Sequence, residues 1–276
     1  MSSFYELVTK NIDREKQLVQ SVYRPTIHAQ GAWNGEDQHM GPVSGLLAAE
    51  IEQFFPRSDM RLARISYDIF GRMYRDECTV RVRMIRPGRT IELVEAQMEI
   101  RGRICVVARA WRMMTQDSGE IAALEDQAVV GPHELSQPWV GQEGWLGGFI
   151  QSLEAVQSSA HRPGQGLVWL NTDKVLVAGH KDSDFAHLMC LVDMANGVAH
   201  RQSDTGLRWS FPNLDLQIHM YRQPVGRWLG IEATQQYGTD GIGLSSAILH
   251  DEQGPFGRSE QILTVRPLPQ SEDKTG

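Results

Sequence analysis

The sequence predicts an α+β fold of two tandem repeats, each a long helix wrapped by a curved antiparallel sheet. The first indication is alternation: in FPNLDLQIHMYR, Phe211 to Arg222, apolar and polar residues exchange places with the period of a half-buried strand. The second is repetition, because RISYDIFGRMYR, Arg64 to Arg75, has the same spacing of Asp, Met, Tyr and Arg. Asp68 thus corresponds to Asp215. Further strand residues repeat as well: Ile91, Leu93 and Ala96 match Ile242, Leu244 and Ala247.

The first repeat is expected to span residues 1–118. After a polar N-terminal segment we expect a strand at Gln17 to Tyr23, and then a loop at Gly31 to Pro42, which is rich in Gly, Asn and Asp. A helix follows, because apolar residues recur at helical spacing from Leu47 to Phe54 before a proline ends the element. The remaining strands of this repeat are expected at Leu62 to Phe70, Cys78 to Ile85, Arg89 to Ile100 and Ile104 to Met114.

Residues 119–144 are expected to form a linker, because they are acidic and rich in Gln, Gly and Pro without sustained periodicity. The second repeat then spans residues 145–276. Its helix is expected to begin near Asp182 or Ser183, either of which could cap it, and to end near Asn196. Its strands are expected at Phe149 to Ser158, Leu167 to Asn171, Leu214 to Tyr221, Trp228 to Tyr237, Gly241 to His250 and Gly257 to Val265.

The composition is that of a soluble globular protein, with 41% hydrophobic and 22% charged residues among 276. The net charge of −7 argues against nucleic acid as a partner, although a few local arginines could still bind a phosphorylated small molecule. Neither a membrane span nor a signal peptide is recognisable, so a cytoplasmic location is expected. The three cysteines lack metal-site spacing and the histidines are scattered, so neither a metal nor a cofactor is expected.

Three stretches carry a resemblance to a known family: ARISYDIFGR, Ala63 to Arg72, MIRPGRTIELVEAQ, Met84 to Gln97, and the segment from Phe211 through Gln261. The chain resembles the double hot-dog acyl-CoA thioesterases related to bacterial acyl-CoA thioesterase II. The resemblance spans nearly all of the chain. It implies a double hot-dog fold, hydrolysis of acyl-CoA to a free acid and CoA without a metal or cofactor, and assembly into a homodimer or larger homo-oligomer.

The same resemblance implies the site residues, since the family uses an Asp, a Thr or Ser, and a Gln. Asp215 takes the place of the catalytic aspartate and Gln261 that of the late glutamine. The hydroxyl position falls on Gln236, where the sequence departs from the family, and Thr234 is expected on the same strand face. Asp215 would then activate a water that Gln261 and Thr234 or Gln236 hold in place.

The oxyanion of the reaction is expected at the N-terminus of the first helix, where unpaired N–H groups offer hydrogen bonds. The candidate residues there are Gly41, Val43 and Ser44. Alternatives stay open for the base, because Glu50 and Asp193 lie within the two predicted helices.

Two other functions also remain open from the sequence. Asp37 and His39 suggest a hydratase of the hot-dog class, although their spacing does not match that class. A non-hydrolytic protein that binds an acyl or aromatic ligand is the main alternative to a thioesterase.

Overall fold

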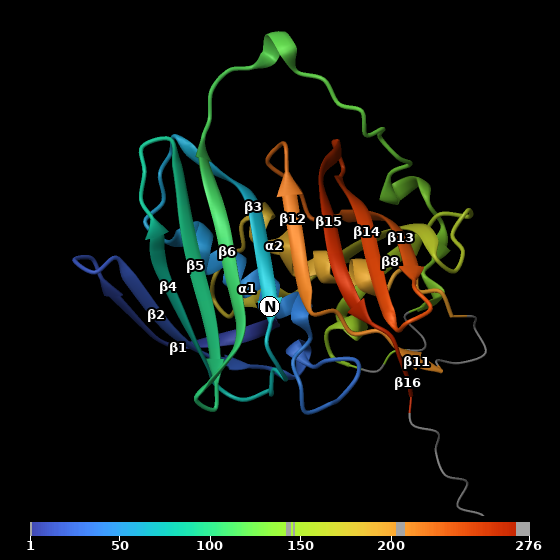
Figure 1. Cartoon of the computed structure of the whole chain (residues 1–276), viewed down its shortest axis with the longest axis horizontal. Helices are drawn as coiled ribbons and strands as arrows, with labels where there is room; N and C mark the ends of the chain where they lie inside the picture. Colours follow the sequence, from blue (N-terminus) through green and yellow to red (C-terminus); the bar gives the residue numbers. More distant parts are fainter. Residues whose placement is uncertain (1, 142–144, 146, 203–207, 269–276) are drawn as a thin grey trace, which may run out of the picture.

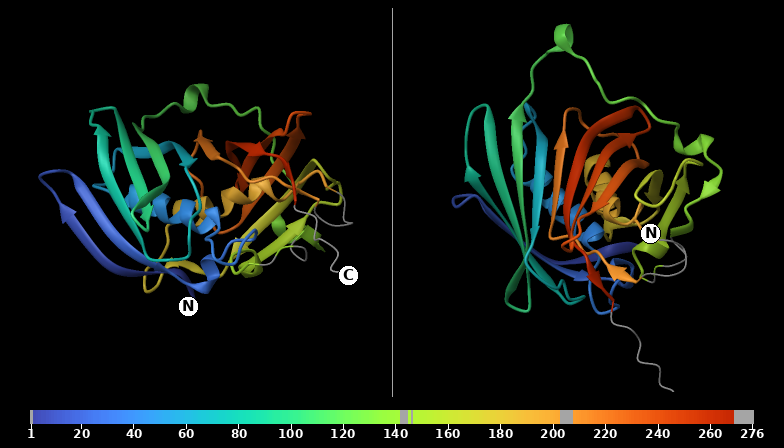
Figure 2. Two further views of the ribbon diagram at one scale, coloured as in Figure 1. Left: turned by 60° about the horizontal axis from the view of Figure 1, so that its bottom comes forward. Right: turned by 45° about the vertical axis from the view of Figure 1, so that its right-hand side comes forward.

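The computed structural model describes residues 2–141, 145, 147–202 and 208–268. Within these residues, fourteen strands form one sheet in the order β10-β1-β2-β4-β5-β6-β3-β12-β15-β14-β13-β9-β8-β7. All recorded pairings in it are antiparallel except that of β1 with β10. The sheet curves around both α-helices, which lie on its concave side (Figures 1 and 2).

The strands of the first half are β1 (Ser3–Asp13), β2 (Leu18–Pro25), β3 (Met60–Ile69), β4 (Cys78–Arg86), β5 (Ile91–Ile100) and β6 (Arg103–Met114). Those that follow in the large sheet are β7 (Gln137–Pro138), β8 (Leu153–Gln157), β9 (Gln165–Thr172), β10 (Val175–Val177), β12 (Asp215–Met220), β13 (Leu229–Tyr237), β14 (Ile242–Asp251) and β15 (Gly254–Thr264). Two short strands, β11 (Trp209–Ser210) and β16 (Arg266–Pro267), pair separately.

The two stretches that share the Asp, Met, Tyr and Arg spacing lie side by side in the centre of the sheet. β3 and β12 pair antiparallel there, with Asp215 opposite Asp68 and Ile218 opposite Ile65. Inward-facing apolar residues such as Ile65 and Ile218 are completely buried, as the alternation predicts. This pairing joins the two halves into one continuous sheet.

The second helix is shorter than the sequence suggested. α1 covers Met40–Gln53 and α2 covers Asp184–Val192, after which a 3₁₀ turn, η6 (Asp193–Asn196), continues the chain. α2 begins as expected, because the Ser183 side chain accepts a hydrogen bond from the Ala186 N–H at 3.1 Å. The expectation of two long helices is therefore not confirmed, since α1 has 14 residues and α2 only nine.

α1 and α2 touch at close range. The Ser44 hydroxyl contacts the Met189 carbonyl oxygen at 2.8 Å, and a Cβ added to Gly45 would come within 2.7 Å of the Cys190 Cβ. This contact brings the start of α1 next to the end of α2, which places residues of both halves beside each other.

Most strands lie within a few residues of their predicted bounds, but β1 was not predicted. Its sequence, SFYELVTKNID, is polar over much of its length, and only its first three residues are buried. After β6 the chain arches past the rim of the sheet to the second half (Figure 1). There Asp126 accepts a hydrogen bond from the Tyr221 hydroxyl at 3.1 Å and pairs with Arg258. None of the helices in the described part of the chain is both long and apolar enough to cross a membrane.

Candidate active site

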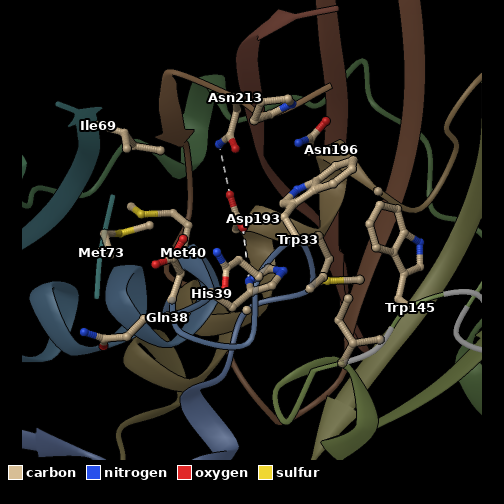
Figure 3. Close-up of a pocket in the computed structure, with 18 of the residues that line it drawn as sticks. Trp33, Gln38, His39, Met40, Ile69, Met73, Trp145, Asp193, Asn196 and Asn213 are labelled. Atoms are coloured by element: carbon tan, nitrogen blue, oxygen red, sulfur yellow. Dashed lines mark hydrogen bonds and ion pairs between the residues drawn. The ribbon is translucent and has the colours of Figure 1, made fainter. Parts of the chain in front are cut away.

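A cavity of about 190 Å³ opens where the start of α1 meets the end of α2 (Figure 3). The loop before α1, the 3₁₀ turn η6 and the segment before β12 supply most of its wall. Most of the lining surface is apolar, and the polar side chains that line it include His39, Asp193, Asn196 and Asn213. Its aromatic and sulfur-containing lining residues are Trp33, Trp139, Trp145, Phe211, Met40, Met73 and Met194.

Asp193 is the buried carboxylate of this cavity, with only 6% of its surface exposed. The end of α2 places it there, as the first residue of η6. Its Oδ1 accepts a hydrogen bond from the Asn213 Nδ2 amide at 3.0 Å (Figure 3). It accepts a second one from Gln261 Nε2 at 3.1 Å. Burial raises the pKa of Asp193 to about 6, although both amide bonds act to lower it. The carboxylate can thus exchange a proton close to neutral pH.

His39 approaches Asp193 from the first half of the chain. It caps α1, because its Nδ1 accepts a hydrogen bond from the Gly41 N–H at 3.0 Å. The same Nδ1 lies 3.3 Å from Asp193 Oδ2. Burial lowers the pKa of His39 to about 3, so the ring is neutral at ordinary pH and the pair is not a salt bridge.

One nitrogen cannot accept a hydrogen from Gly41 and donate one to Asp193 at the same time. With the cap in place the single lone pair of Nδ1 is already used, so a protonated Asp193 can only share it with the Gly41 N–H. When Asp193 is ionised, its Oδ2 faces a nitrogen lone pair and must find another donor. A water molecule in the cavity can be that donor.

Two buried amide oxygens near Asp193 have no hydrogen-bond partner among the described residues. They are Gln261 Oε1 and Asn196 Oδ1. The nitrogen of each amide is engaged: Gln261 Nε2 binds Asp193, and Asn196 Nδ2 donates to the Phe211 carbonyl at 3.1 Å. Buried acceptors of this kind are usually satisfied by water or a ligand.

Of the residues predicted for the catalytic site, only Gln261 lies beside the cavity's carboxylate. Asp215 is on the outer face of the sheet, where its Oδ1 accepts a hydrogen bond from the Ile262 N–H at 2.8 Å. Thr234 and Gln236 are exposed on the outer face of β13, whereas Gln235 between them points inward. Asp215 and Gln261 are therefore on opposite faces of the sheet, and the predicted set does not converge.

The predicted oxyanion residues also differ from the arrangement in the structure. The N–H of Gly41 is already occupied by the His39 ring. Val43 and Ser44 are fully buried one turn further along α1, and the Ser44 hydroxyl is engaged with backbone carbonyls. None of the three lines the cavity, because the helix begins at Met40, earlier than the proline at position 42 suggested.

The residues considered as alternative acids or bases lie in different surroundings. Asp193, one of the two helix carboxylates considered, is in the cavity. Glu50, the other, lies elsewhere, where its Oε1 accepts hydrogen bonds from Lys10 at 3.0 Å and from Ser21 at 3.2 Å. Asp37 lines the cavity but pairs with Arg72 at 2.9 Å, so the acid next to His39 is Asp193 instead.

Asn213 and Asn196 line the cavity but are not predicted as site residues by the sequence. Asn213 stands two residues before Asp215 in the stretch that attracted attention, but an Asn outside the alternating strand resembles an ordinary turn residue. Asn196 was used only as a helix-end signal. No spacing rule links either residue to Asp193. Within the described residues, no group of three or more His, Cys, Asp or Glu side chains could hold a metal ion.

Models of known protein families match both halves of the chain. A model of the acyl-CoA thioesterase N-terminal domain matches residues 29–113, and one of the C-terminal domain matches residues 126–265. A search of curated proteins found no significant match.

Solved structures show the same fold at low sequence identity. A candidate thioesterase II from Thermobifida fusca superposes with a TM-score of 0.71 at 16% identity, covering 93% of this chain and 95% of that one. A hot-dog protein of unknown function from Alicyclobacillus acidocaldarius gives 0.72 at 10% identity, covering 95% and 96%. An acyl-CoA thioesterase II from Mycobacterium marinum gives 0.64 at 12% identity, covering 96% and 97%. The fold is thus a hot-dog fold, and the two matching domain models show that the chain belongs to the acyl-CoA thioesterase family and is a thioesterase.

Proposed function

We propose that the protein hydrolyses acyl-CoA thioesters with a water molecule activated by Asp193. The observation that supports this most is the buried carboxylate at the cavity wall, held through Oδ1 by the amides of Asn213 and Gln261. Because Oδ1 is occupied, Oδ2 is the oxygen free to accept the water's proton. A positioned general base of this kind contributes roughly 10²- to 10⁴-fold to a rate.

The reaction needs little else, since a thiolate is a good leaving group. Water attacks the thioester carbonyl as its proton passes to Asp193, and the tetrahedral intermediate then collapses with release of the CoA thiolate. Protonated Asp193 keeps its Oδ2 3.3 Å from neutral His39 Nδ1, whose single lone pair it can only share with the Gly41 N–H. The thiolate or solvent finally takes the proton, which restores the carboxylate.

The N–H of Met40 is our candidate for binding the oxyanion. Met40 is the first residue of α1 and lines the cavity. The N–H groups of a first helical turn have no acceptor within the helix and carry its positive dipole end. Among the described residues no partner for the Met40 N–H is recorded, whereas the next N–H, that of Gly41, is capped.

Arg72 is a candidate contact for the phosphates of CoA. It lines the cavity, and half of its side chain is exposed. Its guanidinium stands 4.7 Å from the centre of the Tyr74 ring, and Arg101 stands 4.0 Å from the same ring. Each of these guanidinium groups is also paired with a carboxylate, Arg72 with Asp37 and Arg101 with Asp76, so a phosphate would bind Arg72 in competition with Asp37.

We further propose that residues 1–118 and 145–276 are tandem hot-dog repeats joined by a linker at 119–144. The antiparallel pairing of β3 with β12 and the separate N- and C-terminal domain matches support this division. Assembly into a homodimer or larger homo-oligomer is proposed from the family resemblance.

The test is release of free thiol from acyl-CoA by the purified wild type and two matched aspartate variants. We expect Asp193→Asn to lower kcat at least 10²-fold, because the base is lost. Asp215→Asn should keep nearly full activity, since Asp215 faces away from the cavity. An equal loss of activity in both variants, or a loss only in Asp215→Asn, would contradict the assignment of Asp193 as the general base. Ligand binding without any turnover would favour the non-hydrolytic alternative.

A second reaction is favoured by the contact between His39 and Asp193. An acid and a base within 3.3 Å of each other, one from each half, could also add water to the double bond of an enoyl thioester. The conjugated enoyl thioester absorbs in the ultraviolet, so its loss can be followed directly. A decrease of this absorbance without thiol release would identify hydration.

A further inference from the structure

We propose that the cavity selects thioesters of compact aromatic acyl groups, a single ring on a short linker, over those of long fatty chains. This inference rests on the proposed function, since it names the substrate class of the same site. It is carried by the volume of the cavity and by the geometry of three aromatic rings in its wall.

The volume limits what the cavity itself can enclose. The cavity measures about 190 Å³. A cavity of roughly 150 Å³ in another protein accommodates benzene, whereas pockets for drug-sized ligands measure about 300–1,000 Å³. The space next to Asp193 therefore fits one ring with its linker and carbonyl. A long fatty chain would have to extend outside it, where its methylene groups stay in contact with water.

Three aromatic rings are arranged edge to face in the wall. The ring centres of Trp33 and Trp145 lie 4.7 Å apart at 83°, and those of Trp33 and Phe211 lie 5.3 Å apart at 83°. The ring centres of Trp145 and Phe211 lie 6.1 Å apart, and their planes are at 89° to each other. Such pairs present ring faces and edges in fixed directions, and a further ring is bound best when it continues the same edge-to-face pattern.

Trp33 is the ring that a ligand can reach. Both of its aromatic neighbours are buried, yet 45% of its own surface is exposed, so part of it remains free of protein contacts. In Figure 3 it stands between Asp193 and Trp145, and Asn196 and Asn213 lie on the side of Asp193. An acyl ring packed on Trp33 would thus place its carbonyl toward the proposed base.

Methionines form another part of the apolar wall, since Met40, Met73 and Met194 line the cavity together with Ile69 and Ile150. Their thioether sulfurs make favourable contacts with aromatic rings, often at the ring edge. The wall therefore combines rigid aromatic surface with polarisable groups that suit a ring.

The experiment compares kcat/KM for phenylacetyl-CoA, benzoyl-CoA, hexanoyl-CoA and palmitoyl-CoA. We expect the better aromatic substrate to exceed palmitoyl-CoA by at least about tenfold. Trp33→Ala should reduce that aromatic preference by about tenfold, because the accessible ring is lost. Trp209→Ala is the matched control, since Trp209 is equally exposed, at 44%, but does not line the cavity. Palmitoyl-CoA turning over as well as both aromatic substrates would overturn the inference.

Binding separates failure of this inference from failure of the proposed function. Calorimetry with the full-length Asp193→Asn variant measures affinity for phenylacetyl-CoA and palmitoyl-CoA without turnover. Aromatic preference in binding, combined with no hydrolysis by the wild type, would keep the ligand class and reject the proposed reaction. Hydrolysis with a preference for palmitoyl-CoA would keep the proposed reaction and reject the aromatic ligand class. Equal affinity for both ligands in the absence of turnover would reject the ligand class as well.

Discussion

At the scale of single residues, the site depends on how its surroundings set the pKa of one carboxyl. Burial raises the pKa of Asp193 to about 6, while Asn213 and Gln261 act in the opposite direction by stabilising the ionised form. The base works only when ionised. We therefore expect kcat/KM to fall as the pH drops through about 6, which a pH profile measures.

Removing either amide should move this acidic limb to higher pH. In Asn213→Ala or Gln261→Ala the ionised carboxylate loses a hydrogen bond, so its pKa rises and activity lost near neutral pH returns in alkaline buffer. Gln217→Ala is the control, because Gln217 donates to Asp215 on the outer face at 3.2 Å. A purely structural role for the amides would lower activity equally at every pH.

At the scale of elements, the contact between α1 and α2 holds the two halves of the site together. Gly45 allows that contact: an added Cβ would lie 2.7 Å from the Cys190 Cβ and from a Leu176 methyl carbon. His39 precedes α1 and Asp193 follows α2, so any shift between the helices changes the distance that joins them.

We expect Gly45→Ala to destabilise the fold by about 1–3 kcal/mol, the usual cost of overpacking a buried contact. Activity should fall together with stability. The control is Gly71→Ala, because an added Cβ there meets nothing within 4 Å and the backbone conformation is ordinary. Urea unfolding of both variants measures the difference. Gly45→Ala as stable as the wild type would show that the helices can separate without cost.

At the scale of the whole molecule, the buried ionised Asp193 lowers the free energy of unfolding. The pKa of Asp193 is about 6 in the fold and 3.8 in its ordinary environment, so the folded state holds the proton more tightly between these values. Stability therefore falls as the pH rises through this interval, and the full cost, about 3 kcal/mol, is present above pH 6.

Asp193→Asn should therefore be more stable than the wild type at pH 8, with little difference near pH 4. Thermal unfolding at the two pH values measures this. His187 affects stability in the opposite direction, because burial lowers its pKa to about 3. Both proteins therefore lose stability in acid, where the unfolded state binds a proton at this histidine more readily than the folded state does. The same acid loss in both variants serves as the internal control. A Tm for Asp193→Asn below that of the wild type at pH 8 would contradict the assigned cost.

Alternation in the sequence determined most of the strands, including β3 and β12 though not their pairing, and the capping residues located the start of α2, because these features depend on neighbours close in the chain. It also placed Asp215 correctly on the polar side of its strand, but that side is the outer one. A polar group that serves the cavity must point inward against the pattern, as Gln261 does, so periodicity hides such groups. Tertiary structure alone decided which carboxylate is in the cavity. His39 and Asp193 are joined only by the packing of α1 on α2, and no local rule relates residues so far apart in the chain.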